Sequence, residues 1–217
     1  PMISIGHQYL FMHRDFGLPR HKFPASYALD FFSRLTSVGS VKHLALSFRE
    51  MEDDDEHDII VVPPLLREEV YALETTDGDY LHGYMLNAGF AEDVLSWHKE
   101  HPEVPLHFFW DKRGADKVTK VDGTLSFHMI DDREFLSQMA GCHAYASTAG
   151  FESVCEAMWM GKPILMVPSH IEQEINAFDA QRSGAGIVSD KFDLSQLLEF
   201  SETYIPNENF RKWASQA

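Results

Sequence analysis

The segment that decides the fold of this chain reads HAYASTAGFESVCEAM, residues 143–158. An apolar strand ends at Ser147, Ala149-Gly150 forms a turn, and a helix begins near Phe151. At such a junction in a parallel sheet, the first N–H groups of the helix point into the crevice at the carboxyl ends of the strands. Because helix N-termini attract anions and Gly150 permits a close approach, the junction predicts a ligand site, with phosphate as the candidate ligand.

Short apolar runs alternate with helical patterns on both sides of this junction. The predicted strands are residues 80–86, 106–110, 124–128, 143–147, 163–168 and 186–188. The predicted helices are residues 90–100, 132–139, 151–160, 174–182, 193–200 and 207–213. This alternation predicts an α/β fold in which a Rossmann-like parallel sheet carries helices on both faces.

The first 57 residues do not fit that sheet. They contain two predicted strands, 2–5 and 42–47, with a helix over 25–35 between them and an acidic run, 52–58, read as a solvated loop. Two strands and a helix cannot cover both faces of a sheet. We therefore expect residues 1–57 to be the remnant of another Rossmann domain. Residues 58–190, opening with a strand over 58–62, form the main domain, and residues 191–217 form C-terminal helices.

Composition excludes several classes of function. Lys and Arg number 18 against 34 Asp and Glu, a net charge of −16, which argues against nucleic-acid binding and against a polybasic membrane surface. We see no apolar run of transmembrane length and no signal peptide. The two cysteines and 12 histidines show no metal-type spacing, so we predict no metal site. Two buried, reduced cysteines would suit a cytoplasmic protein.

Three further polar residues stand where a ligand would meet them. Glu156 lies about 9 Å along the helix from Gly150, one sugar unit from a phosphate held at the helix start, where a carboxylate can accept ribose hydroxyls. Glu172 and Gln173 follow the next strand, and an acid beside an amide can grip several sugar hydroxyls. The alternative is that all three are solvated helix-surface residues. Asn176 is a poor helix-interior residue, so we expect it to bond something specific.

Several motifs occur together in the order and spacing of a known domain. They are Thr148-Ala-Gly-Phe-Glu-Ser-Val-Cys-Glu156, Gly161-Lys-Pro163, Val167-Pro168, Glu172-Gln-x-x-Asn-Ala177 and Gly184-Ala-Gly186. Over residues 58–190 the chain resembles the C-terminal, donor-binding domain of GT-B glycosyltransferases. It is most similar to the branch of the peptidoglycan lipid-intermediate N-acetylglucosaminyltransferase and related uncharacterised bacterial and archaeal transferases. The segments 5–8 and 62–67 resemble the end of the N-terminal, acceptor domain and its linker.

The resemblance implies metal-independent transfer of a hexose from a UDP-linked donor to an acceptor hydroxyl, without a cofactor. It also implies roles for residues in this sequence. The diphosphate would lie at Ala149, Gly150 and Phe151, beside Asn87 and Gly89; the base at Met129 and Ile130; the ribose at Glu156; the donor sugar at His170, Glu172 and Gln173. Glu152 departs from this scheme, because it places a negative charge near the phosphates.

The resemblance places the catalytic base in the N-terminal domain, which this sequence mostly lacks, and leaves His7 and His170 as weak candidates. For His7 a structural role at a strand end is the alternative. Two other functions stay open: a sugar-nucleotide 2-epimerase of the same fold, and a non-catalytic donor-binding subunit that needs a partner. We expect the isolated chain to self-associate through residues 1–48, where Phe11, Phe16, Phe31 and Phe32 add apolar area.

Overall fold

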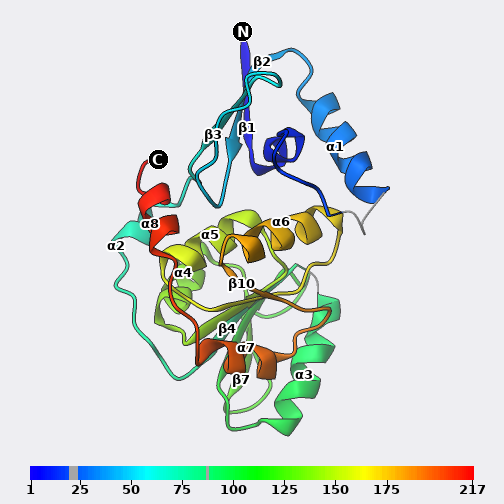
Figure 1. The fold of residues 1–217 in the computed structure, drawn as a ribbon. Coiled ribbons are helices and arrows are strands. Elements are labelled where there is room, and N and C mark those ends of the chain that lie inside the picture. The colour runs from blue at the N-terminus through cyan, green and yellow to red at the C-terminus, as the bar shows by residue number, and fades with distance from the viewer. Residues whose placement is uncertain (20–23, 87) are drawn as a thin grey trace.

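Two parallel β-sheets, one small and one large, organise the computed structural model, which describes residues 1–19, 24–86 and 88–217 (Figure 1). The small sheet has the order β1-β2-β3 and the large sheet the order β10-β9-β8-β4-β5-β7-β6. All neighbouring strands run parallel except β6, which pairs antiparallel with β7. The chain thus has the α/β architecture that the sequence predicts.

The small sheet is built from β1 (Met2–Gly6), β2 (Ser40–Leu46) and β3 (Ile59–Val62), with η1 (His7–Met12) and α1 (Ala25–Thr36) between the first two strands. The sequence assigned residues 58–62 to the main domain, and this assignment is wrong for the strand. β3 pairs with β2 in register, His43 opposite Ile59. A four-residue apolar run carries no information about which sheet it will join, because pairing is a long-range choice.

The large sheet contains β4 (Leu81–Met85), β5 (Leu106–Trp110), β6 (Val118–Lys120), β7 (Leu125–Met129), β8 (Ala144–Ser147), β9 (Ile164–Met166) and β10 (Gly186–Val188). Central strands such as β5 are mostly apolar, with His107 the one polar residue of β5, because helices cover both faces. Gly83 in β4 has a packing reason: a Cβ there would lie 2.2 Å from the ring of Phe108. After β7 the chain crosses back to the other side of β4 to form β8, so the strand order reverses there and a topological switch point lies between β4 and β8.

Helices cover the two faces of the large sheet. Their bounds are α2 (Glu68–Ala72), η3 (Ala88–Phe90), α3 (Ala91–Glu100), α4 (Asp132–Gly141), α5 (Phe151–Trp159), α6 (Ile171–Arg182), α7 (Leu194–Ser201) and α8 (Glu208–Ala214). One core cluster joins one face to α4, α5 and α6, and a second joins the opposite face to α3 and α7. Helix α6 begins at Ile171, three residues before its predicted start, so Glu172 and Gln173 lie in its first turn. The sequence did not predict α2 or β6.

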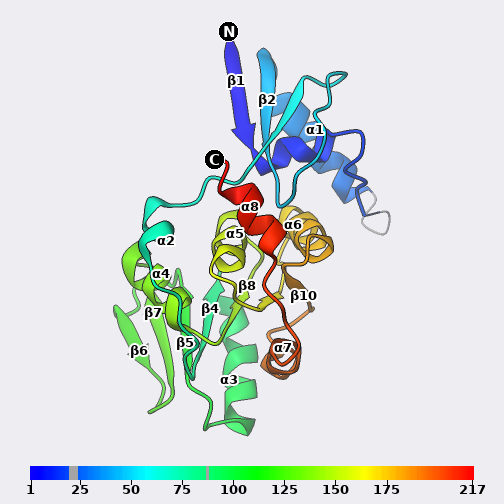
Figure 2. The same ribbon diagram turned by 60° about the vertical axis from the view of Figure 1, so that its left-hand side comes forward.

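The small sheet packs on the helices of the large one through a third apolar cluster (Figure 2). Phe11 and Phe16 are buried in it together with Ile175 of α6 and Trp213 of α8. The expectation that these two phenylalanines add exposed area is therefore wrong. Phe31 and Phe32 on α1 are exposed, as are Met2, Ile3 and Ile5 of the edge strand β1.

The acidic run 52–58 is not simply a solvated loop. Asp54 is fully buried and accepts hydrogen bonds from the backbone N–H of Arg14 and from the ring of His57. These bonds hold the pKa of Asp54 down, to about 2, although burial opposes them. The expectation of a solvated loop fails because a carboxylate that caps a neighbouring loop is stabilised by hydrogen-bond donors from that loop. A local sequence pattern does not show those donors.

Candidate functional site

The cavity that contains most of the predicted site residues lies between the small sheet and the helices α4, α5 and α6. Its volume is about 900 Å³, large enough for a sugar nucleotide. It is lined by Gly6 and His7 from the end of β1, by the linker that follows β3, and by the first turns of α4, α5 and α6. A second cavity of about 780 Å³ lies beside η1 and α1 and contains none of the predicted site residues. We therefore describe the first cavity as the candidate site.

The turn after β8 is held in a strained conformation by its surroundings. Ala149 has φ 62°, a left-handed conformation that is rare for a residue with a side chain. Its N–H donates to the hydroxyl of Ser147, and its carbonyl accepts a hydrogen bond from Nδ2 of Asn176. The prediction that Asn176 bonds something specific is confirmed, since its amide braces this turn from inside α6. Its Oδ1 is buried and finds no partner among the described residues.

Gly150 is the N-cap of α5, and no side chain caps the helix. Its φ is −66°, so glycine is not needed there for conformational reasons. The position of a Cβ is nearly open, with Ser153 Oγ the nearest described atom at 3.7 Å. Gly150, Phe151 and Glu152 all line the cavity. The free first-turn N–H groups can therefore meet an anion, although Glu152 stands at the same wall and opposes one.

Glu156 lies deeper in the cavity and is paired with an arginine. Its side chain is 1% exposed, and its two oxygens accept hydrogen bonds from Nε and Nη2 of Arg67 at 2.6 and 2.7 Å. Burial raises the pKa of Glu156, and the guanidinium opposes that rise. A two-fold guanidinium–carboxylate contact requires an ionised carboxylate. The alternative of a solvated surface residue is excluded for Glu156.

The start of α6 supplies the residues predicted for the donor sugar. His170 is the N-cap, and His170, Glu172 and Gln173 all line the cavity. Glu172 is exposed, whereas Gln173 is buried and its Oε1 accepts from the N–H and the hydroxyl of Ser169. The bonds to Oε1 orient the amide, so that the N–H donors of its Nε2 remain for a ligand.

Some predicted residues are not at the cavity. Ile130 lines it, but Met129 ends β7 against the core, Ala149 is buried behind the turn, and Gly89 in η3 is absent from the lining. Asn87 lies outside the described residues.

In the described ranges no three histidine, cysteine or acidic side chains gather as metal ligands would. Within the same ranges, no helix has the length and apolar character needed to cross a bilayer.

His7 lies at the cavity wall, where it contacts both the small sheet and helix α5. Its ring stacks on Phe151 at a centroid distance of 4.1 Å, and its Nδ1 lies 2.7 Å from the carbonyl oxygen of Leu46, so Nδ1 carries the proton. Nε2 lies 4.0 Å from Oδ2 of Asp179. Burial lowers the pKa of His7 to about 4, and Asp179 offsets this only in part. A base this weak is poorly matched to proton abstraction near neutral pH, which favours the structural alternative for His7.

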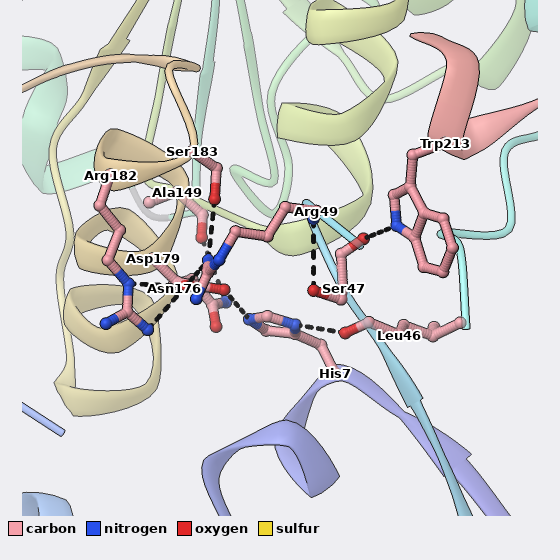
Figure 3. A network of polar contacts seen from close by, with 10 residues as sticks. All are labelled: His7, Leu46, Ser47, Arg49, Ala149, Asn176, Asp179, Arg182, Ser183 and Trp213. Atoms are coloured by element: carbon pink, nitrogen blue, oxygen red, sulfur yellow. Dashed lines mark hydrogen bonds and ion pairs between the residues drawn. The ribbon is translucent and has the colours of Figure 1, made fainter. Parts of the chain in front are cut away.

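Asp179 is the centre of a polar network behind this wall (Figure 3). It is fully buried and accepts from Arg49, which follows β2, and from Arg182 in its own helix. Arg49 also bonds Ser183, and the indole N–H of Trp213 bonds the carbonyl of Ser47 at 3.0 Å. The small sheet is therefore tied to α6 by charge-assisted bonds of Arg49 and to α8 by a neutral hydrogen bond, as well as by the apolar cluster.

Sequence reasoning missed Arg67 as a site residue. The signal available was indirect: Glu156 stands among Val154, Cys155 and Ala157, which predict a buried face, and a buried carboxylate needs a cation. The partner itself comes from 89 residues away, and no local pattern identifies it.

A cavity between two parallel α/β units, with its polar residues at strand ends, is the arrangement of a GT-B glycosyltransferase. Similar solved structures support this fold class. The glycotransferase of kitacinnamycin matches with a TM-score of 0.62 at 15% identity, covering 89% of this chain and 59% of that one. Arabidopsis thaliana UGT89C1 complexed with UDP-L-rhamnose matches with a TM-score of 0.54 at 16% identity, covering 99% of this chain and 58% of that one. Spinosyn rhamnosyltransferase SpnG complexed with spinosyn aglycone matches with a TM-score of 0.53 at 13% identity, covering 92% of this chain and 60% of that one.

Residues 1–205 match glycosyl transferase family 1, and the chain belongs to that family. No curated protein sequence matches it. The chain spans about three fifths of the length of the three solved structures described above. The resemblance to glycosyltransferases is thus confirmed at the level of family and fold, and the peptidoglycan branch is not confirmed.

Proposed function

We propose that this chain binds a nucleoside diphosphate sugar, UDP-linked, in the cavity between its two sheets, for transfer of the sugar to an acceptor hydroxyl. One observation carries the proposal: the uncapped start of α5, the buried Glu156 about one and a half turns further on, and Glu172 with Gln173 at the start of α6 all face one cavity. These positions would supply an anion site, a ribose acceptor and sugar-binding groups, which are the three kinds of contact that a sugar nucleotide needs.

The chemistry follows from this placement. The acceptor oxygen attacks the anomeric carbon, the bond from that carbon to the diphosphate oxygen breaks, and the diphosphate leaves with the bonding electrons. The N–H groups of residues 151–153 would stabilise the charge on the leaving group, in place of a metal. The acceptor proton passes to a general base, for which we propose a residue of the acceptor-side domain outside this chain. His7 is a poor alternative, because its low pKa makes it a weak base and Leu46 fixes its ring; His170, which lines the cavity, stays a candidate.

Two neighbours support the choice of donor class. UGT89C1 is a complex with UDP-L-rhamnose, and SpnG is a rhamnosyltransferase. Rhamnose is a six-carbon sugar, so both neighbours agree with the proposed hexose transfer. The motifs between Thr148 and Gly186 still favour the peptidoglycan N-acetylglucosaminyltransferase branch as the source of the sequence pattern.

We assign the small sheet to an acceptor-side domain of which this chain holds only part. Support comes from the exposed apolar side chains on β1 and α1, from the edge position of β1 in the small sheet that the described residues form, and from the share of similar structures that the chain does not cover. The isolated chain should therefore bind the donor without transferring the sugar. A cytoplasmic location is also proposed, since Cys142 and Cys155 are both free and buried.

The test is calorimetry with nucleoside diphosphates and then with their sugars, using Gly150→Ala as the diagnostic variant. Its methyl group meets no close protein atom but projects where the diphosphate would lie, so the fold should persist while binding weakens about tenfold or more. Gly123→Ala is the matched control, because that position is also open and lies away from the cavity. Failure of the wild-type chain to bind any nucleoside diphosphate would refute the proposed function. Conversion of the donor alone to an epimer would favour the 2-epimerase.

A further inference from the structure

Arg67 is the residue on which the candidate nucleotide site converges. It follows β3 in the linker between the two sheets and stands at the N-cap of α2. Besides its two bonds to Glu156, its Nη1 lies 3.3 Å from Oδ1 of Asp132, and its guanidinium lies 5.9 Å from the centre of the Phe135 ring. Asp132 and Phe135 line the cavity next to Ile130, where the base is expected. Arg67 therefore lies between the groups expected to meet the ribose and those expected to meet the base.

The pairing leaves Glu156 able to bind a ligand. Each carboxylate oxygen has two acceptor positions, and Arg67 uses one on each oxygen. Glu156 still lines the cavity, so the remaining positions are available on that side. Two acceptors held side by side match the neighbouring 2′- and 3′-hydroxyls of a ribose. The guanidinium also keeps the buried carboxylate ionised, because it opposes the rise in the pKa of Glu156 that burial causes.

We propose that Arg67 is a positioning residue that orients Glu156 to accept both ribose hydroxyls of the nucleotide, so that the linker between the two sheets contributes to donor affinity. This inference rests on the proposed function and adds a residue to it. Two other roles are possible for an arginine here and make different predictions. Among the described residues that line the cavity, Arg67 is the only lysine or arginine, so it could bind the diphosphate directly. It could also block Glu156 until a ligand displaces it.

The experiment measures how strongly the chain distinguishes a ribonucleoside diphosphate from its 2′,3′-dideoxy form. The base is chosen first, by titrating wild-type protein with the diphosphates of uridine, thymidine, adenosine and guanosine. Both sugar forms of the preferred base are then titrated. One hydrogen bond to an ionised group is worth about 10- to 150-fold, so two hydroxyl bonds should favour the ribose form by at least about 10-fold in wild-type protein. Inorganic diphosphate serves as a third ligand that lacks a ribose.

Arg67→Met should reduce this preference to about threefold or less, while the dideoxy form and inorganic diphosphate bind as they do to wild-type protein. Glu156→Gln should lose a similar share of the preference for the ribose form. The double variant should lose little more of this preference than either single variant, because the two residues act as one unit. Arg67→Lys keeps the charge but cannot make two parallel bonds, so an intermediate preference is expected. Arg67→Lys also keeps the inference testable if Arg67→Met is unfolded at the temperature of the titration.

Arg133→Met is the matched control, since Arg133 is an exposed arginine on the same helix as Asp132 and does not line the cavity. It should keep the wild-type preference. Three results would overturn the inference: an unchanged ribose preference in Arg67→Met, equal weakening of all three ligands, which would assign Arg67 to the diphosphate, or tighter binding, which would make it a block. Wild-type protein that binds no nucleoside diphosphate would instead overturn the proposed function.

Discussion

Arg49 and Asp179 are 130 residues apart in sequence and form a direct guanidinium–carboxylate hydrogen bond that joins the small sheet to α6 (Figure 3). Asp179 is fully buried, so its charge depends on Arg49 and Arg182 for compensation. The same helix carries Gln173 and Asn176 at the cavity. The placement of the small sheet and the shape of the candidate site are therefore set by one helix.

Asp179→Asn should destabilise the protein by about 1–3 kcal/mol, because it leaves two arginines without their buried counter-charge, although both are partly solvated. The loss should be uneven. Amide hydrogen exchange should rise over residues 2–48 more than over β4, β5 and β8. Asp30→Asn, which removes the half-buried partner of the exposed Arg34, is the control and should change stability by less than about 1 kcal/mol. A uniform loss of protection across both sheets would contradict this account of the interface.

Stability should fall in mild acid because two buried histidines resist protonation. Burial lowers the pKa of His7 to about 4 and that of His82 to about 3, from 6.5. The unfolded chain takes up protons below about pH 6.5 and the folded chain does not, so the free energy of unfolding decreases by about 1.4 kcal/mol per pH unit for each histidine. Urea denaturation between pH 7.5 and 5.0 measures this slope.

His82→Leu isolates one of the two contributions. His82 is packed among the rings of Phe109, Phe135 and Tyr145, where an aliphatic side chain of similar size can fit. Between pH 7.5 and 5.0 the variant should lose about 2 kcal/mol less than the wild type. Phe135→Leu, which disturbs the same core without removing a titrating group, should keep the wild-type slope. An unchanged slope in His82→Leu would mean that His82 is protonated in the folded protein.

Donor binding should not require a divalent metal. Over the described residues no metal-binding group of histidine, cysteine or acidic side chains is present, and the start of α5 offers uncapped N–H groups instead. Calorimetry with UDP should give the same dissociation constant in chelator as in magnesium or manganese. Binding that depends on either ion would contradict the proposed role of the helix terminus.

The isolated chain should self-associate through α1 and β1. Phe31 and Phe32 are 67% and 59% exposed, and β1 is an edge strand of the small sheet that the described residues form. Light scattering should give a mass above the 24.8 kDa of one chain, rising with concentration. Replacing both phenylalanines by glutamate should return it to one chain. Ile205→Glu, at an exposed residue far along the chain, should not. A concentration-independent monomer in the wild type would refute this prediction.

The sequence by itself determined six of the seven strands of the large sheet, all except β6. The predicted strand over residues 106–110 is β5 to the residue, and helix α5 begins at Phe151 as the turn residues indicate. These features are local: an apolar run of strand length and a Gly-containing turn depend only on nearby residues. The motif order also identified the chain correctly as a glycosyltransferase of the GT-B fold, whereas the peptidoglycan branch is not confirmed. The roles of Glu156, Glu172 and Gln173 stay predictions, although all three meet in one cavity.

Only the tertiary structure decided which distant residues meet. It moved β3 to the small sheet, buried Asp54 in a loop of like charges, and paired Glu156 with Arg67 and Asp179 with Arg49. It also showed that the strained residue of the site turn is Ala149, held by Asn176, rather than the glycine beside it. Each of these depends on a buried polar group finding a partner far along the chain. Burial makes such a partner necessary, but nothing in the local sequence says which one the fold will supply.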